Sequence, residues 1–321
     1  MNKYTPEGTR IVTPENREAL SSLRALERTM EEGRIAESIA LLCDEEFSLH
    51  FDLYGIPAVM PRQEAQLTEP GESVKDIAIL TRVGKPVCFR IIGFSRRADG
   101  RTEAILSRRA AQAECRARFV SALLPGDVIP ARVTHLENFG AFVDIGCGIV
   151  SLLSIDCISV SRISHPADRF AVGDSIYAVI RRIDDAGRIY VTHRELLGTW
   201  EENAVRFSAG QTVAGVVRSV ESYGIFIELL PNLAGLAEPK EGVLPGDTAA
   251  VYIKSILPEK MKIKLIVIDS HAAPQNRDFE YFFCPDEIRH ISRWVYSPAG
   301  SAKTIETVFD GTNDEKNEAG S

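Results

Sequence analysis

One short pattern of residues occurs twice in this chain of 321 residues. The tetrads FGAF at 139–142 and YGIF at 223–226 each place a glycine and one aliphatic residue between two aromatic rings. Each tetrad follows a glycine, Gly126 or Gly210, at the same distance along the chain. A unit that recurs in this way indicates tandem small domains, each built from one supersecondary pattern. The repeat therefore predicts copies of one fold rather than a single large core.

Short β-like runs surround both tetrads and fill most of the chain. A second β series runs over 128–192 and a third over 213–268. A first series fits the pattern more weakly, and in it Phe47 and His50 fall where the other copies have their rings. Its candidate strands lie at 35–42, 47–53, 87–94 and 102–106. We therefore expect three related β domains, of which the first has diverged.

Helices are expected before and between the β series. Thr13 followed by Pro14 is typical of a helix start, and leucines at helical spacing predict one amphipathic helix of about five turns that ends near Gly33. The other expected segments are a loose N-terminus at 1–12, a loop or short helix at 61–75, and connecting helices at 107–120 and 195–207.

The tetrads carry the chemistry of base stacking. Residues three apart in a strand normally face opposite ways, but the glycine in each tetrad permits a bulge or tight bend that brings both rings to one surface. Phe139 with Phe142, and Tyr223 with Phe226, would then form platforms for unpaired bases. Burial of these rings in the core is the alternative, and their occurrence in two equivalent places favours the platform.

Basic residues accompany both platforms. They are Arg132, Arg181, Arg182, Arg188 and Arg194 in the second series, and Lys254, Lys260, Lys262 and Lys264 in the third. Lys262 and Lys264 alternate with apolar residues, which predicts a strand with one basic and one buried face. Beside a platform such a face is suited to tracking a phosphate backbone, and a merely solvated face is the alternative.

The overall charge argues against a broad basic surface. The formal net charge is −8 and the sequence pI is near 5.4. Nucleic-acid binding normally depends on a basic footprint. We therefore expect binding led by stacking, with a few local basic side chains supplying the phosphate contacts.

Longer segments around the tetrads resemble a known family. The second series, with GDVIPARV, NFGAFVDIG, VGDSIYAVIRRID and GRIYVTHRELLGTW, resembles an S1 domain of the bacterial ribosomal protein S1 family. The third, with GQTVAGVVRSVESYGIFIEL and EKMKIKLIVID, is similar to a second copy, and 33–109 resembles a diverged third. The layout and the C-terminal stretch EYFFCPDEIRHISRWVYSP resemble the compact three-repeat form of the family.

The resemblance implies a mainly β fold of three tandem S1-type OB-fold five-stranded barrels, with connecting helices and an N-terminal helix. The expected divisions are an N-terminal helical segment at 1–33, a diverged S1-like repeat with its linker helix at 34–118, an S1 domain at 125–195, a linker helix at 196–208, an S1 domain at 209–270, a C-terminal extension at 271–309 and a disordered tail at 310–321.

The family's RNA site uses two aromatic rings, a histidine, an aspartate and an arginine. The resemblance places the aspartate at Asp184 and the arginine at Arg188 in the second repeat, with Ser154 at the histidine position. In the third repeat Glu238 and Pro258 stand at the histidine and aspartate positions, and in the first Pro61 stands at the histidine position. The residues predicted to bind RNA are Phe139, Phe142, Asp184, Arg188, Arg132, Tyr223, Phe226, Lys262 and Lys264.

Several classes of function find no support in the sequence. There is no GxxxxGK[ST] loop, HExxH or GxSxG motif, so we expect no enzymatic activity and no cofactor. The six cysteines include no CxxC pair, which favours free thiols over a metal site. No apolar run is long enough to span a bilayer, and we expect a cytoplasmic protein with no membrane partner.

The sequence thus predicts a protein that holds single-stranded mRNA on the small ribosomal subunit. The second and third repeats would bind RNA, and the first repeat with the N-terminal helix would be free to dock on protein. Two alternatives stay open: an accessory protein of a ribonuclease or RNA polymerase complex, and a protein-protein interaction module whose barrels have lost RNA binding.

Overall fold

The computed structural model describes residues 3–69, 71–273, 278–284 and 287–309. The chain divides into two compact units. The first comprises 1–123, 130–132 and 144–150, and the second comprises 124–129, 133–143 and 151–321. The predicted disordered tail lies outside the described residues. Within the described part, no helix has both the length and the apolar character needed to cross a bilayer.

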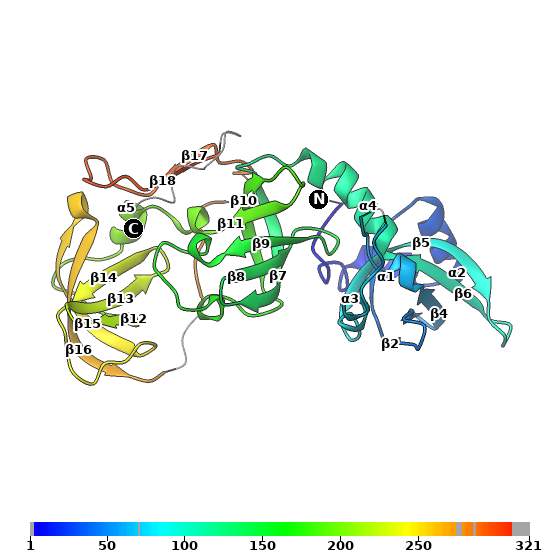
Figure 1. Cartoon of the computed structure of the whole chain (residues 1–321), viewed down its shortest axis with the longest axis horizontal. Helices are drawn as coiled ribbons and strands as arrows, with labels where there is room; N and C mark the ends of the chain where they lie inside the picture. The colour runs from blue at the N-terminus through cyan, green and yellow to red at the C-terminus, as the bar shows by residue number, and fades with distance from the viewer. Residues whose placement is uncertain (1–2, 70, 274–277, 285–286, 310–321) are drawn as a thin grey trace. The chain divides into compact units, whose positions relative to one another are not determined.

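Two closed five-stranded barrels account for the second and third β series (Figure 1). One consists of β7 (Val128–Glu137), β8 (Gly140–Asp144), β9 (Val150–Ser154), β10 (Ser175–Ile183) and β11 (Ile189–Thr192). The other consists of β12 (Thr212–Glu221), β13 (Gly224–Leu230), β14 (Leu233–Ala237), β15 (Thr248–Leu257) and β16 (Lys262–His271). In both barrels the third strand pairs in parallel with the fifth. We call them the second and third barrels.

The first β series forms an open six-stranded sheet. Its strands are β1 (Ala36–Ile39), β2 (Leu42–Cys43), β3 (Leu49–Leu53), β4 (Ile56–Met60), β5 (Pro86–Arg96) and β6 (Thr102–Ser107). β1 pairs with β5 and β2 with β3, as though one strand had been broken at Ala40 and Leu41, and β4 pairs in parallel with β6. The first sheet therefore keeps the connectivity of the barrels in the form of a half-barrel.

The single N-terminal helix predicted from the leucine spacing is wrong, because the structure has two. α1 spans Pro14–Leu20 and α2 spans Leu23–Glu31. Thr13 caps α1 as predicted, but Ser22 adopts an extended backbone and its hydroxyl accepts the backbone N–H of Ala25, which starts a second helix. A short polar side chain that bonds to a nearby backbone N–H favours a helix start at its own position over a continuous helix.

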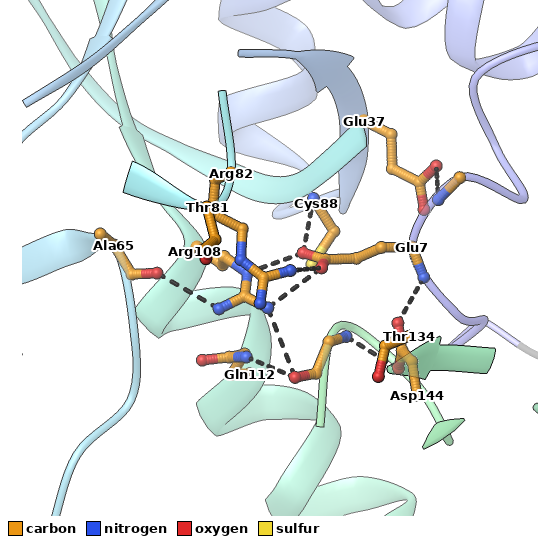
Figure 2. Close-up of polar contacts among 12 residues, drawn as sticks. Glu7, Glu37, Ala65, Thr81, Arg82, Cys88, Arg108, Gln112, Thr134 and Asp144 are labelled. Atoms are coloured by element: carbon orange, nitrogen blue, oxygen red, sulfur yellow. Dashed lines mark hydrogen bonds and ion pairs between the residues drawn. The ribbon is translucent and has the colours of Figure 1, made fainter. Parts of the chain in front are cut away.

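The expectation that residues 1–12 are loose is also wrong for the residues described (Figure 2). Glu7 is buried and accepts hydrogen bonds from Arg108 Nε at 2.7 Å and from the Cys88 backbone N–H at 3.1 Å. Its own N–H donates to the Asp144 carboxylate at 2.7 Å. Burial alone would raise the pKa of Glu7, but the guanidinium of Arg108 holds that pKa below its usual value.

The connecting helices differ from the sequence expectation at one place. α4 (Arg108–Arg118) agrees with the segment predicted, and Ser107 caps it. In contrast, α5 is confined to Trp200–Ala204, because the chain turns at Gly198 with a φ of 81°. α3 (Asp76–Leu80) and strand β4 were not predicted.

The C-terminal extension packs onto both barrels of the second unit. β17 (Arg293–Val295) pairs with β18 (Glu306–Val308), and Trp294 and Tyr296 lie in the core of the third barrel. Earlier in the extension, the Tyr281 hydroxyl accepts the backbone N–H of Tyr177 of β10 at 2.8 Å. The ring of Tyr281 also lies 5.6 Å from that of His193.

The acidic residue that follows each tetrad is a buried structural anchor. In the third barrel, Glu228 accepts hydrogen bonds from Arg169 at 2.9 Å and from Arg218 at 3.0 Å. All three side chains are at most 8% exposed. Asp144 of the second barrel accepts the backbone N–H groups of Gly146 and Glu7. Both acids therefore attach β8 or β13 to another segment of the chain.

Replacement of Glu228 by glutamine should destabilise the fold strongly. The change removes the charge of the carboxylate that pairs with two buried guanidinium groups, and breaking a buried pair typically costs about 3–5 kcal/mol. Glu280→Gln is the matched control, because its partner Arg206 and Glu280 itself are exposed and the loss should stay below about 1 kcal/mol. Urea unfolding of both variants measures the difference. Equal stabilities would contradict the structural role of Glu228.

Candidate nucleic-acid interface

The two aromatic pairs have nearly the same geometry. The ring centroids of Phe139 and Phe142 are 6.0 Å apart with planes at 89°, and those of Tyr223 and Phe226 are 6.1 Å apart at 86°. Phe139 is 56% exposed and Tyr223 is 66% exposed. The first ring of each pair therefore presents its surface to solvent, while the second is half-buried and supports it edge-on.

The glycine inside each tetrad serves a different structural role from the one predicted. A Cβ on Gly140 would lie 2.4 Å from the carbonyl oxygen of Leu153, and one on Gly224 would lie 2.7 Å from that of Ala237. The glycines thus allow a neighbouring strand to approach closely. The bend that exposes the first ring comes from the turn just before the strand, since Phe139 and Tyr223 lie outside β8 and β13.

A groove of about 820 Å³ lies beside the third barrel's ring pair. Tyr223 and Phe226 line it, together with four lysines of this barrel: Lys254, Lys260, Lys262 and Lys264. Along β16 the lysines alternate with buried Ile263 and Leu265, which confirms the predicted basic face. Glu238, at the histidine position of the resemblance, also lines the groove.

These four lysines are available to a ligand. In the described part of the chain, none of them forms an ion pair, whereas Arg169, Arg188 and Arg194 each pair with a carboxylate. An uncommitted ammonium group loses little on meeting a phosphate, because no existing partner has to be displaced. The groove therefore combines a stacking surface with positive charge, and these are the two components of a site for single strands.

Asp184 and Arg188, the two predicted polar site residues of the β10–β11 hairpin, bond to each other. Asp184 accepts the backbone N–H of Arg188 at 2.9 Å and its Nε at 2.7 Å, across the turn between β10 and β11. The Arg188 N–H and guanidinium lower the pKa of Asp184. Arg188 stays 72% exposed, so its guanidinium is held at one edge yet open to solvent.

The sequence missed two rings on the second barrel. The His135 ring lies 6.3 Å from Phe142 at an interplanar angle of 25°, which extends the ring pair. Tyr190 pairs with Leu152 of β9 and carries the guanidinium of Arg182 at 4.1 Å from its ring centre. By strand register Tyr190 occupies the place of Lys264. Arg188 and Tyr190 lie two positions apart, as Lys262 and Lys264 do, and this spacing could have shown from the sequence that Tyr190 belongs to the same strand face.

The other arginines of the second series are dispersed. Arg132 has its guanidinium next to Gly8 in the first unit. Arg181 donates to the Cys157 sulfur at 3.2 Å, and Arg194 pairs with Glu195. The predicted cluster of five is therefore not brought together, and a contact of Arg132 with RNA stays a prediction.

In the first sheet, the residues at the two ring positions, Phe47 and His50, already have partners within the protein. His50 lies 2.7 Å from the carboxylate of Asp44, and Phe47 has the guanidinium of Arg62 4.9 Å from its ring centre. Phe47 is also packed against the first unit's core. At these two positions the first sheet therefore lacks the exposed ring that both barrels present.

Comparison with known proteins identifies the fold family. A family model described as the S1 RNA binding domain matches residues 124–194. The small ribosomal subunit protein bS1 of Leuconostoc lactis is 32% identical over 191 residues, which cover 54% of this chain and 44% of that protein. The bS1 protein of Rhizobium meliloti is 27% identical over 281 residues, 80% of this chain and 47% of that protein.

Residues 124–194 therefore match the S1 RNA binding domain family. The chain spans about half the length of these curated relatives. The matched residues coincide with the second barrel, so the S1 domain with its exposed ring pair is the part of the chain that the family model describes. Among the described residues, no group of three or more His, Cys, Asp or Glu side chains is placed to hold a metal ion.

Gly140→Ala should destabilise this S1 domain by about 1–3 kcal/mol, the usual cost of overpacking. The added methyl would meet a backbone oxygen, which has no freedom to rotate away. Gly93→Ala is the matched control, since its Cβ would be 4.0 Å from the nearest atom and the change should be neutral. Thermal unfolding of both variants checks this, and an unaffected Gly140→Ala would refute the close-approach argument.

Proposed function

We propose that the chain binds single-stranded RNA through its second and third S1 domains and acts in translation with the small ribosomal subunit. The observation that carries the proposal is the pair of matching, exposed ring platforms, one of which borders a lysine-lined groove. The names of the relatives support the ribosomal context. Such a role places the protein in the cytoplasm.

The mechanism is passive capture. The rings of each barrel stack on bases, and the nearby basic side chains follow the phosphates. Two weak sites on one chain bind a common strand with an effective concentration on the order of millimolar, so their avidity exceeds either affinity. Phe139, Phe142, Tyr223 and Phe226 provide the stacking. Asp184, Arg188, Arg132, Lys262 and Lys264 are the proposed polar contacts.

The double variant Phe139→Ala with Tyr223→Ala should weaken binding of an oligouridylate by about 1–3 kcal/mol for each ring in contact with a base. Tyr54→Asn is the control, because Tyr54 is 60% exposed in the first unit and asparagine tolerates its φ of 53°. Fluorescence anisotropy with a labelled strand measures both. Undiminished affinity in the double variant would favour a module that has lost RNA binding.

The first S1-like sheet is proposed to dock on protein. Exposed aliphatic side chains border the break between β1 and β2 and the neighbouring α3: Ile39, Leu41, Leu42, Ile77, Leu80 and Val83. The bridge between Ala40 and Val83 holds the two stretches together. Exposed aliphatic groups gathered in this way are suited to a protein surface. The absence of an exposed ring at the two tetrad positions of this sheet fits the same division of roles.

Leu41→Glu with Leu42→Glu should reduce cosedimentation with RNase-treated small ribosomal subunits by at least about tenfold, because charge enters an apolar contact. Oligouridylate affinity should stay unchanged. Val205→Glu, at an 81% exposed site in the second unit, is the control. Retention of the double variant on the subunits would overturn the docking role. Polysome fractionation then distinguishes a ribosomal partner from a ribonuclease or RNA polymerase complex.

A further inference from the structure

The groove of the third barrel has walls that the barrel does not supply. Tyr296 and Ile305 line it from the C-terminal extension, and Trp200 lines it from α5. Val160 and Ser161, from the loop that follows β9, complete this side. The third barrel alone would therefore present a flatter ring-and-lysine face. These added residues give the site its concave form.

The C-terminal wall is firmly attached. The Tyr296 hydroxyl donates to the carbonyl oxygen of Asn232 at 2.6 Å, and the Trp200 backbone N–H donates to the Tyr296 carbonyl at 3.0 Å. The Tyr296 N–H in turn donates to the carbonyl of Ile305 at 2.9 Å, so the two lining residues are bonded to each other. Tyr296 is 5% exposed. The wall is thus fixed and does not have to order when a ligand enters.

β14 also lines the groove, through Ala234, Gly235, Leu236 and Ala237. Gly235 is buried, and a Cβ on it would lie 2.6 Å from the core side chain of Leu265 on β16. Gly235 therefore allows β14 to lie close to the core of the barrel. Leu236 is 37% exposed and adds apolar surface between the rings of β13 and the lysines of β16.

The two sides of the groove differ in chemistry. Tyr223 and Phe226 come from β13 and the turn before it, whereas Lys262 and Lys264 come from β16, on the other side of β14. Ile305 adds a further apolar side chain to the lining. A flat aromatic group with an attached anion matches this division, because the base meets apolar surface and the phosphate meets ammonium groups. A nucleotide has this composition.

We propose that the C-terminal extension forms one wall of a nucleotide-binding groove on the third barrel, with Ile305 contacting the base that is stacked on Tyr223. This rests on the proposed RNA-binding function and adds the residues of the extension to the site. The nucleotide is either part of an RNA strand or a free mononucleotide, since both present a base joined to a phosphate.

The test uses the full chain carrying Phe139→Ala, so that the third barrel dominates binding. Adding Ile305→Ala should lower the affinity for labelled hexauridylate about fivefold, through loss of apolar contact. Val308→Ala, on β18 of the same extension and outside the groove lining, should leave the affinity unchanged. Thermal unfolding of each variant verifies that the fold is retained.

The outcomes separate the two levels of the proposal. Suppose that Tyr223→Ala weakens binding and that the Ile305→Ala variant folds but binds normally. The role of the extension is then overturned, while the proposed RNA binding stands. If neither matters, the proposed function itself fails. Should Ile305→Ala unfold, crosslinking of 4-thiouridine hexanucleotide to the unmodified wall decides: adducts at 293–309 support the wall, and their absence overturns it. Competition by uridine monophosphate supports a free-nucleotide source, and no competition supports a strand.

Discussion

The buried carboxylate of Glu228, which follows the second ring tetrad, is the constraint on which the arrangement of the second unit depends. Ile227 points into the barrel core, so Phe226 and Glu228 on either side of it lie on the outer surface of β13. Glu228 is nevertheless buried, because Arg169 and Arg218 cover it. A buried ion needs partners that satisfy it fully, and this requirement fixes the segment around Arg169 against β13. The same strand face therefore carries a structural junction at one end and an exposed ring platform at the other.

This arrangement also explains how an acidic protein presents a basic groove. The carboxylates of Glu7 and Glu228 are buried against guanidinium groups, whose positive charge largely cancels theirs outside the fold. Four lysines of the third barrel are exposed and line a single groove. Net charge counts all of these groups equally, whereas a ligand at the groove meets mainly the near ones. In the proposed function, stacking of bases on Tyr223 and Phe226 would add attraction that does not depend on charge.

Much of the fold was predictable because strand periodicity and tandem repeats are local signals. The strands of both barrels, the ring pairs and the basic face of β16 follow from residues two to four positions apart. The failures involve long-range partners or backbone competition. From the sequence alone Glu7 is expected at the surface, whereas in the fold it is buried against Arg108. Ser22 is expected inside a helix, whereas its hydroxyl caps the start of the next helix. Gly198 shortened the linker helix because its φ of 81° lies outside the helical range.

The site was predictable in its rings and only partly in its polar groups, for a physical reason. A ring at the turn before a strand is exposed by local geometry alone, so two equivalent tetrads identify two platforms. An arginine reaches several ångströms and finds whichever carboxylate or carbonyl lies within that distance. Arg132 and Arg194, equally plausible from sequence, accordingly end in different surroundings. The walls given by Tyr296 and Ile305 were beyond prediction, because they come from a segment distant in sequence whose packing on the third barrel decides the shape of the groove. The shape of the groove thus depends on tertiary packing, whereas the exposure of its rings depends on local sequence.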